Sequence, residues 1–526
     1  MSSKTSPAPD SDSGFDAAGP AFSMRRKIGF LLGVPLFLFL MWPALTPGLS
    51  EAGRRLLATS GLMAFWWITE AIPIPATALL PLSLFPLLGI LPMAEVTRHY
   101  GDENVFLFLG GFLIALAMQK WNLHRRLALH IVRFIGTAPQ RLVLGFMCAT
   151  AFISMWISNT ATAMMMYPIA LAVILQLAPE QAANDQQQAI NNFRTCMMLA
   201  IAYAASIGGL GTMLGTPPNL IFVSAAEKFF PAAPRVNFLQ WMTFGVPLVL
   251  VFIPLVWFLL TRLLFPVTKD LFFGGEDLID AEIKKLGRMS TGERRVLIIF
   301  ILTALAWIFR VDLKLDFITI PGWASRLKID DKVSDAAIAM MAGTMLFMIP
   351  TNFKRGEFLL DWGTAMKIPW GILLLFGGGI AMSAGFKATG LSTWLGERLT
   401  LLGALPTPAL IAAICLLVTF LSELTSNTAT ATIFMPIMAA TASALHLHPF
   451  LLMVPAALAA SSGFMLPVAT PPNAIAFASG YITVSQMARA GFWLNLIGVL
   501  LISAAVYLLV VPVFEIEWQG LPAWAK

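Results

Sequence analysis

The sequence predicts an all-α polytopic membrane protein with about eleven transmembrane helices and two re-entrant hairpins. Composition is the first observation behind this prediction. Of the 526 residues, 58% are hydrophobic and 12% are charged, and the mean hydropathy is +0.78, whereas soluble domains carry about 25% charged residues. Many apolar runs reach the roughly 20 residues that a helix needs to cross a bilayer. A membrane β-barrel would instead show short segments of alternating polarity.

The second observation is an internal repeat of two motifs. The hexapeptide Ser-Asn-Thr-Ala-Thr-Ala occurs at residues 158–163 and again at 426–431, and each copy is followed by Thr-Pro-Pro-Asn, at 216–219 and 470–473. Both motifs interrupt apolar stretches with residues that unwind helices. Matched interruptions in two halves of a membrane chain indicate a transporter binding site near the bilayer midplane.

The first half of the chain contains a tail, a group of helices and one repeat. Residues 1–27 are predicted to form a disordered cytoplasmic tail, because they are rich in Ser, Pro and Asp and end in Arg25, Arg26 and Lys27. N-terminal transmembrane helices follow over 28–103, with spans near 28–46, 54–70 and 71–92. The first repeat covers 104–265, in this order: a span at 104–122, an amphipathic helix at 125–134, a hairpin at 142–175, a broken span at 195–223 and a final span at 240–263.

The second half repeats this order after a basic loop. The loop at 266–295 is predicted to be cytoplasmic because of its lysines and arginines, which include Lys284, Lys285, Arg288, Arg294 and Arg295. Linking transmembrane helices fill 296–368. The second repeat covers 369–514, in this order: a glycine-rich span at 370–388, an amphipathic helix at 391–402, a hairpin at 409–442, a broken span at 451–479 and a last span at 491–513. Residues 515–526 form a C-terminal tail.

Charge predicts the orientation of these elements in the cell membrane. With the N-terminus inside and each hairpin returning to the side from which it enters, eleven spans place the basic loop inside and the C-terminus outside. The first hairpin then opens from the cytoplasm and the second from outside, so the repeats are inverted. Arg54 and Arg55 conflict with this arrangement because they fall outside. The net charge of +6 reflects topology, and no nucleic-acid partner is expected.

A break in a membrane helix exposes backbone groups, so it is tolerated only where it is buried or lines a polar cavity. The half-helix that ends presents carbonyl oxygens, and the half-helix that begins presents N–H groups. Ser, Asn and Thr are good N-cap residues, and proline suits the first helical position. Four half-helix N-termini are therefore expected to converge on an anion, beside oxygen-lined cation sites. A single Ser-Asn-Thr more often joins neighbouring helices by hydrogen bonds, but the recurrence of both motifs favours a binding site.

The motifs resemble those of the divalent anion/sodium symporter family, which includes sodium-coupled dicarboxylate, citrate and sulfate carriers. Residues 66–73 (Trp-Trp-Ile-Thr-Glu-Ala-Ile-Pro) and 104–111 (Asn-Val-Phe-Leu-Phe-Leu-Gly-Gly) also resemble its bacterial dicarboxylate members. The resemblance covers nearly all of the chain after residue 27. It implies a homodimer in the bacterial inner membrane, surrounded by lipid. It also implies an inverted-repeat fold in which a transport domain moves past a scaffold domain in an elevator-like manner, the scaffold including the helices over 28–103.

The resemblance also implies which residues bind the co-transported Na⁺ and the dicarboxylate. The first sodium site would use Ser154, Ser158, Asn159 and Gly215. The second would use Ser422, Thr425, Asn427 and Ala469. Substrate carboxylates would contact Asn159, Thr160, Thr216 and Pro217 from the first half, and Asn427, Thr428, Thr470 and Pro471 from the second. The function implied is symport of sodium with C4-dicarboxylates such as succinate, fumarate and malate.

Several alternatives stay open at this point. Citrate or sulfate could replace the dicarboxylate, and proton coupling or exchange could replace sodium symport. Glu423 either takes part in cation or proton binding or is a structural carboxylate. An intramembrane enzyme would need a nucleophile–base or metal constellation, and neither Glu70, Glu423 nor the histidines provide such spacing. The chain is therefore predicted not to be an enzyme, and a channel would need a continuous pore.

Overall fold

The structure is a computed structural model that describes residues 23–176, 184–268, 275–315, 318–330, 332–399, 405–517 and 520–525. Residues 1–22 of the predicted N-terminal tail lie outside this part of the chain. Helix α1 (Met24–Leu40) begins inside the range predicted for that tail, and Ser23 caps it through a hydrogen bond from the Arg26 N–H group to Ser23 Oγ. Helix α2 (Glu51–Thr69) packs along α1.

The span predicted near 71–92 is interrupted, because two short helices follow one another there. They are α3 (Ile74–Thr77) and α4 (Leu80–Leu87), and α5 (Met93–Tyr100) follows. Proline lacks an N–H group and clashes with the preceding turn, so it is favoured only at the start of a helix. Prolines stand in the first turns of both α3 and α4, where they begin new helices instead of continuing one.

Each repeat folds into the same series of helices. In the first repeat they are α6 (Glu103–Lys120), α7 (Leu123–Ile135), α8 (Pro139–Ser154), α9 (Asn159–Gln176), α10 (Asn184–Gly208), α11 (Pro217–Phe229) and α12 (Phe238–Phe258). In the second they are α18 (Trp370–Ala388), α19 (Leu391–Leu399), α20 (Thr407–Ser422), α21 (Asn427–Ala444), α22 (Phe450–Ala460), α23 (Pro471–Ala478) and α24 (Val484–Ala505). Helix α12 continues as a π-helix, Leu259–Leu264, and α24 as another, Val506–Val510, followed by α25 (Val511–Val513).

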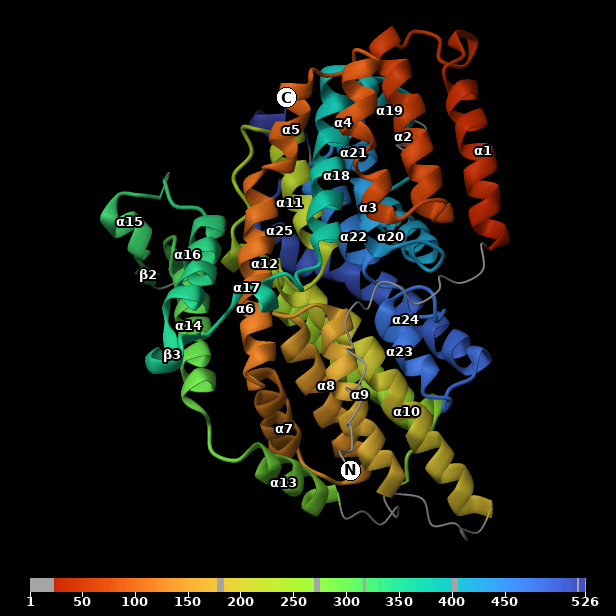
Figure 1. The fold of residues 1–526 in the computed structure, drawn as a ribbon. Helices are drawn as coiled ribbons and strands as arrows, with labels where there is room; N and C mark the ends of the chain where they lie inside the picture. Colours follow the sequence, from red (N-terminus) through yellow and green to blue (C-terminus); the bar gives the residue numbers. More distant parts are fainter. Residues whose placement is uncertain are drawn as a thin grey trace, which may run out of the picture.

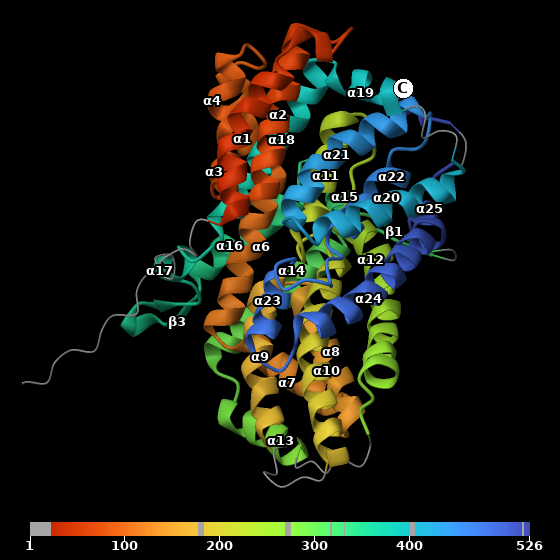
Figure 2. The ribbon, with the colours of Figure 1, turned by 90° about the vertical axis from the view of Figure 1, so that its right-hand side faces the viewer.

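The two repeats exchange their broken helices. Hairpin α8–α9 packs on α10 of its own repeat, and hairpin α20–α21 packs on α22. Helix α11, however, contacts α21 and α22 of the second repeat, while α23 contacts α9 and α10 of the first. Figures 1 and 2 show α7–α10 toward one end of the molecule and α18–α22 toward the other, with α23 between them. All four breaks therefore lie near the middle of the molecule.

Within the described residues, the strands all lie in the segment between the repeats. Its helices are α13 (Gly275–Leu286), α14 (Thr291–Ile308), α15 (Trp323–Leu327), α16 (Asp335–Met348) and α17 (Trp362–Ala365). Two small antiparallel hairpins correct the all-α prediction: β1 (Leu313–Leu315) pairs with β2 (Ile318–Ile320), and β3 (Pro350–Asn352) pairs with β4 (Glu357–Phe358). Both are short connections outside the two repeats.

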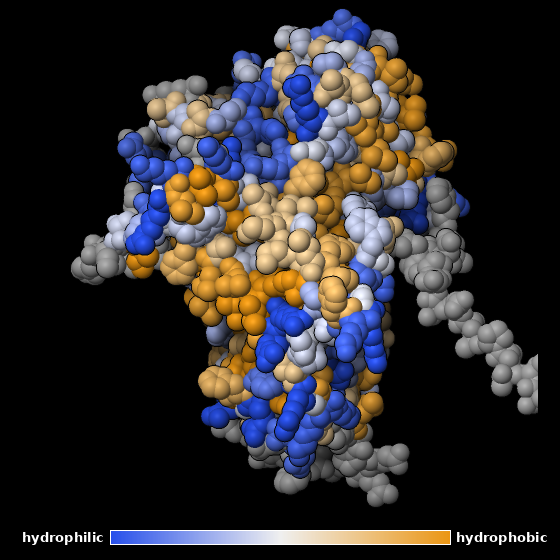
Figure 3. Space-filling view, turned by 60° about the vertical axis from the view of Figure 1, so that its left-hand side comes forward, coloured by the Kyte–Doolittle hydropathy of each residue, from blue (hydrophilic) through white to orange (hydrophobic). Residues whose placement is uncertain are grey.

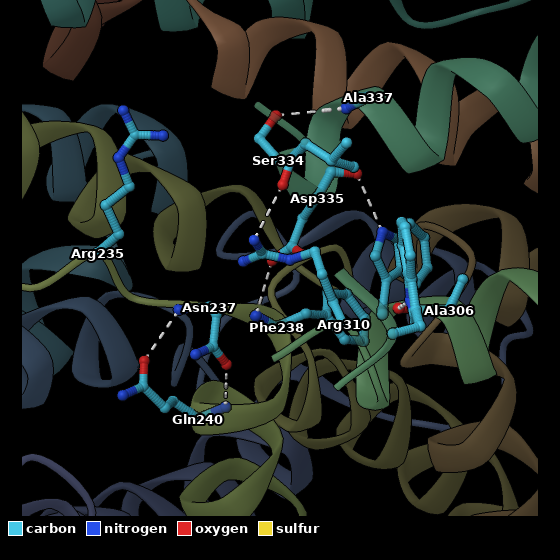
Figure 4. Close-up of polar contacts among 12 residues, drawn as sticks. Arg235, Asn237, Phe238, Gln240, Ala306, Arg310, Ser334, Asp335 and Ala337 are labelled. Carbon is cyan, nitrogen blue, oxygen red and sulfur yellow. Dashed lines mark hydrogen bonds and ion pairs between the residues drawn. The ribbon is translucent and has the colours of Figure 1, made fainter. Parts of the chain in front are cut away.

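A buried ion pair ties this segment to the first repeat (Figure 4). Arg310 lies just after α14, and its Nε is 2.6 Å from Asp335 Oδ1 at the start of α16. The other carboxylate oxygen of Asp335 accepts from the N–H group of Phe238, the first residue of α12, at 2.9 Å. The side chains of Arg310 and Asp335 are only 11% and 8% exposed. The charge of Asp335 is therefore matched by a guanidinium group and by the N-terminus of a helix, as a buried charge requires.

Ion pairs also attach the basic loop to the amphipathic helix α7. Arg125 pairs with Glu282 of α13 at 2.6 Å, and Arg133 pairs with Asp280 at 2.8 Å. Arg126 contacts Glu293 of α14 at 2.5 Å. The positive residues of α7 are therefore matched by acidic residues that the sequence analysis did not single out.

The surface fits a protein surrounded by lipid. Within the described residues, five helices are long and apolar enough to cross a membrane: Met93–Lys120, Gln187–Gly211, Phe238–Leu264, Trp370–Ala388 and Val484–Val513. Shorter apolar helices accompany them, so the count of eleven spans stays a prediction. On the face drawn in Figure 3, hydrophobic residues cover the middle and hydrophilic residues gather at the lower end. Exposed side chains such as Leu250, Leu302 and Leu500 contribute apolar surface, of a kind that soluble monomers rarely expose in large patches.

Candidate functional site at the paired helix breaks

The first Ser-Asn-Thr sequence lies at a true break between two helices. Helix α8 ends at Ser154 and α9 begins at Asn159. Ser158 caps α9, because its hydroxyl oxygen accepts from the Ala161 N–H group at 3.4 Å and its carbonyl accepts from the Thr162 N–H group at 3.0 Å. The N-cap role expected for Ser158 is therefore present in the structure.

Asn159 is the centre of the first break. One terminal atom of its amide lies 2.7 Å from Ser154 Oγ, 3.1 Å from the Ala205 carbonyl and 3.2 Å from the Gly215 carbonyl. All three neighbours accept hydrogen bonds, so the atom that faces them is the amide nitrogen. Ser154 is fully buried and also donates to the Ala205 carbonyl at 2.6 Å. The break thus gathers three oxygen atoms, from α8, α10 and the loop before α11, around one amide group.

The second break repeats the serine of this arrangement, but there the asparagine oxygen faces the serine. Helix α20 ends at Ser422 and α21 begins at Asn427. The Ser422 hydroxyl donates to Asn427 Oδ1 at 2.9 Å and to the Ala460 carbonyl at 2.6 Å. Ser422 is also fully buried. The serine five residues before each asparagine therefore connects that asparagine to the end of the broken helix in its own repeat.

The Thr-Pro-Pro-Asn motifs begin the second halves of the broken helices. Thr216 is the N-cap of α11 and Thr470 is the N-cap of α23, each followed by two prolines. Because proline has no N–H group, these helix starts lack two of the donors that a helix N-terminus normally offers. The two kinds of helix start therefore differ: α9 and α21 begin without proline, while α11 and α23 begin with a threonine cap and two prolines. The convergence of the four N-termini on an anion stays a prediction.

A hydroxyl contact links the two repeats. Thr216 Oγ1 of the first repeat lies 3.4 Å from Ser461 Oγ, directly after α22 of the second. Both side chains are buried. Other predicted site residues differ in exposure: Thr425, Thr428, Ala469 and Thr470 are buried, Thr160 and Pro217 are half-buried, and Pro471 is exposed. Thr425 Oγ1 contacts Thr430 Oγ1, so the threonine one turn into α21 already has a partner.

Close backbone packing explains a difference between the two repeats. A Cβ atom on Gly215 would lie 2.5 Å from the Gly209 carbonyl oxygen, a distance that real Cβ atoms do not adopt. At the matching position the second repeat has Ala469, whose Cβ would lie 3.3 Å from a Cβ on Gly463. The loop before α11 is therefore tighter than the loop before α23, and only the first requires glycine.

Glu423 has a structural environment. One carboxylate oxygen accepts from the N–H groups of Phe464 and Met465 and from Asn495 Nδ2, at 2.6, 2.9 and 2.8 Å. The other accepts from the N–H groups of Met465 and Leu466, at 3.0 and 3.1 Å. Three successive backbone N–H groups form an anion-binding concavity. Both oxygens of Glu423 are thus occupied by the loop after α22 and by α24, which favours the structural interpretation of this residue.

Sequence reasoning missed three asparagines that the structure places next to these breaks. Asn219 and Asn473, the last residues of the two Thr-Pro-Pro-Asn motifs, are fully buried and bond to the preceding loops, and Asn495 donates to Glu423. The repeat of Thr-Pro-Pro-Asn was a signal for the first two, because asparagine occupies the same place in both copies. A single asparagine in α24 offers no comparable signal.

Two cavities in the structure lie away from the residues predicted to contact substrate. One of about 600 Å³ is bounded by α11, α19, α21 and Trp524. Another of about 350 Å³ is lined by Glu103, Glu227, Arg235 and Asp335, close to the cluster in Figure 4. Neither is lined by the residues predicted to contact substrate. In the part of the chain that the structure describes, no three His, Cys, Asp or Glu side chains gather as a transition metal or zinc would require.

Comparisons with known proteins agree with the resemblance. Residues 26–514 match the family model described as "Sodium:sulfate symporter transmembrane region". The sodium-dependent dicarboxylate transporter SdcS of Staphylococcus saprophyticus is 43% identical over 504 residues, which cover 95% of this chain and 95% of that protein. SdcS of Staphylococcus aureus (strain MRSA252) is 43% identical over 497 residues, which cover 94% and 93%.

Two solved structures share the fold. MtrF of Neisseria gonorrhoeae superimposes with a TM-score of 0.55 at 12% identity, over 90% of this chain and 98% of its own. The YdaH transporter of Alcanivorax borkumensis gives 0.55 at 16% identity, over 92% and 98%. These likenesses concern the fold alone. The family model and the relatives match nearly the whole chain, which is therefore a multi-pass membrane protein of the sodium:sulfate symporter transmembrane family, a family of transporters and not of enzymes.

Proposed function

We propose that this protein is a secondary active transporter that carries C4-dicarboxylates such as succinate, fumarate and malate into the cell together with sodium ions. The observation that carries the proposal is the pair of oxygen clusters around Asn159 and Asn427. Each cluster combines a serine hydroxyl and an asparagine side chain at a helix break, with the Ala205 and Gly215 carbonyls in the first and the Ala460 carbonyl in the second. Hydroxyl, amide and carbonyl oxygens are the ligands that hard cations such as Na⁺ bind.

Asn159 would couple the cation to the anion. In the structure, the amide nitrogen faces Ser154 Oγ and two backbone carbonyls. Turning the amide by about 180° brings Oδ1 to the same three oxygens, which then form a set of four ligands for Na⁺. The turn also directs the amide N–H groups away from the cation, where they can donate to a carboxylate. Sodium binding would therefore prepare the first break for substrate.

The remaining residues of the two sites follow from this arrangement. Ser158 would complete the first sodium site, which already includes Gly215, and Ser422, Thr425, Asn427 and Ala469 would form the second. One substrate carboxylate would contact Asn159, Thr160, Thr216 and Pro217, and the other would contact Asn427, Thr428, Thr470 and Pro471. Two symmetric breaks suit a ligand with two carboxylates, and the relatives named above are called dicarboxylate transporters.

The larger assembly is also part of the proposal. Two copies of the chain would form a homodimer in the bacterial inner membrane, with the N-terminus in the cytoplasm and the C-terminus outside. The hairpins and broken helices would move together past a scaffold that includes the helices over 28–103. The exchange of α11 and α23 between the repeats supports this proposal, because it joins both hairpins into one packed unit.

Uptake into proteoliposomes tests the function. Radiolabelled succinate, citrate and sulfate are supplied with an inward sodium gradient, with choline in its place, and with a proton gradient alone. We expect sodium-dependent uptake of succinate that saturates and shows counterflow. Succinate uptake that ignores the sodium gradient would exclude symport. Faster citrate or sulfate uptake would change the substrate, and uptake that requires preloaded dicarboxylate would indicate an exchanger. A flux without counterflow would indicate a channel.

A further inference from the structure

The asparagine that ends each Thr-Pro-Pro-Asn motif makes the same pair of hydrogen bonds in both repeats. Asn219 Nδ2 donates to the carbonyls of Gly209 and Thr212 at 2.9 and 2.7 Å. Asn473 Nδ2 donates to the carbonyls of Gly463 and Leu466 at 3.3 and 3.0 Å. In each case the acceptors lie ten and seven residues earlier in the chain. Both asparagines have 0% exposure.

These bonds compensate for donors that the loop lacks. The loops between α10 and α11 and between α22 and α23 have left the helical hydrogen-bonding pattern, so their carbonyls need donors from elsewhere. The prolines that follow cannot provide N–H groups. One side-chain amide has two N–H donors and replaces both. Within the described residues, the Oδ1 atoms of Asn219 and Asn473 have no hydrogen-bond partner, so both side chains are placed to serve as donors.

Each clamped loop holds the backbone residue assigned to a sodium site. In the first loop, Thr212 accepts from the Gly215 N–H group through its hydroxyl at 3.2 Å, and the Thr212 hydroxyl donates to the Met155 carbonyl in the first break. In the second loop, the Leu466 carbonyl accepts from the Ala469 N–H group at 3.1 Å, while the Leu466 N–H group donates to Glu423 in the second break. The residue clamped by each asparagine therefore connects the cation-binding loop to its hairpin.

We propose that Asn219 and Asn473 are positioning residues for sodium, each fixing the loop carbonyl of one cation site, Gly215 for the first and Ala469 for the second. Neither asparagine touches the ion. The inference rests on the proposed function, since it assigns roles within the same sites. It predicts that each asparagine controls the sodium affinity of one site.

Four variants test this: Asn219→Ala, Asn219→Asp, Asn473→Ala and Asn473→Asp. The first measurement is the melting temperature of the purified full-length protein without substrate, titrated with sodium against choline. Ligand binding to the folded state raises the melting temperature by an amount that grows with the logarithm of 1 + [Na⁺]/Kd. We expect each variant to need at least about tenfold more sodium for the same rise in melting temperature. Aspartate should be worse than alanine, because its carboxylate oxygens face carbonyl oxygens.

The second measurement is the sodium dependence of succinate uptake in proteoliposomes. Loss of one cation site should lower the Hill coefficient for sodium, while the succinate KM at saturating sodium changes much less. Thr150→Val and Thr441→Val are matched controls, because each threonine is fully buried and its hydroxyl donates to a carbonyl of its own helix. Asn219→Gln and Asn473→Gln keep the donor groups and should recover part of the sodium affinity.

The outcomes separate this inference from the function on which it rests. If the unchanged protein shows no sodium-dependent stabilisation or uptake, the proposed function fails. If it responds to sodium and the asparagine variants respond at the same concentrations, only the clamp is contradicted. A variant can have a lower melting temperature in choline and still need the same sodium concentration for half-maximal succinate uptake. That result shows a purely structural role and also overturns the inference. Where an alanine variant does not fold, the sodium affinity and the Hill coefficient of the glutamine variants test the inference instead.

Discussion

At the scale of single residues, the two serines that precede the asparagines make equivalent contacts in both repeats. Ser154 and Ser422 are fully buried, and each bonds to the asparagine five residues later and to a carbonyl at the end of a broken helix. The sequence predicted both positions because the resemblance points to a hydroxyl there. It did not reveal Ala205 and Ala460 as the carbonyl partners, since an alanine in an apolar helix carries no signal of its own.

Replacing Ser154 with alanine should weaken sodium binding at the first site. The change removes one proposed ligand and leaves buried acceptors without a donor, which costs about 1–3 kcal/mol. We expect the sodium concentration for half-maximal succinate uptake to rise by about tenfold or more. Ser154→Thr, which keeps the hydroxyl, is the comparison. A variant with unchanged sodium dependence would remove Ser154 from the site.

Replacing Glu423 with glutamine should affect folding more than coupling. The NH₂ group of glutamine would face one of the two sets of N–H donors that the carboxylate now accepts. We expect a lower melting temperature in choline as well as in sodium. In the protein that folds, the sodium concentration for half-maximal succinate uptake should stay the same. Loss of sodium dependence at unchanged stability would instead assign Glu423 to the cation site.

At the scale of elements, the positions of the helix breaks were predictable, but the secondary structure elsewhere was predictable only in part. Two hairpins, two broken helices and two amphipathic helices all occur close to the expected ranges, because Ser-Asn-Thr and Thr-Pro-Pro are strong local signals for helix ends. The span near 71–92 is divided into α3 and α4, since prolines stand in the first turn of each. The β1–β2 and β3–β4 hairpins were missed because strands of two or three residues are too short for a periodic pattern.

The loops before α11 and α23 should differ in their tolerance of a methyl group. Gly215→Ala places a Cβ atom against the Gly209 backbone, and overpacking of this kind typically costs about 1–3 kcal/mol. We expect this variant to lose most succinate uptake, whereas Ala469→Gly should retain it within about twofold. Equal loss in both variants would contradict the difference in packing, and surface expression measured for each separates transport from folding.

At the scale of the whole molecule, the N-terminal helix reaches the second break. Arg25 Nε donates to the Ile68 carbonyl of α2 at 2.9 Å, and Arg25 Nη2 donates to the Leu424 carbonyl at 2.9 Å. Leu424 lies between α20 and α21, in the break itself. The proposed scaffold and the proposed moving hairpin therefore meet at a point that must change if the hairpin moves.

Cross-linking residues 25 and 424 should stop transport. A variant with Arg25→Cys and Leu424→Cys, in a background without Cys148, is treated with a short cleavable cross-linker. We expect succinate uptake to fall at least about tenfold and to recover on cleavage, because an elevator motion requires the two helices to separate. Each single-cysteine variant is the control. Full uptake by the cross-linked protein would contradict movement of this hairpin relative to α1.

The sequence by itself determined the class of protein, the two repeats, the family and the four breaks, because composition and helix-ending residues act locally. Only the tertiary structure decided which carbonyls surround each asparagine. It also decided that Glu423 is enclosed by backbone N–H groups and that Asn219 and Asn473 fix the loops. The bonds of Ser154, Ser422 and Glu423 join residues 51, 38 and 41 positions apart in the sequence. The bonds of Asn219 and Asn473 join a side chain to backbone carbonyls. A carbonyl is present at every residue, so its role depends on where the packing of the helices places it.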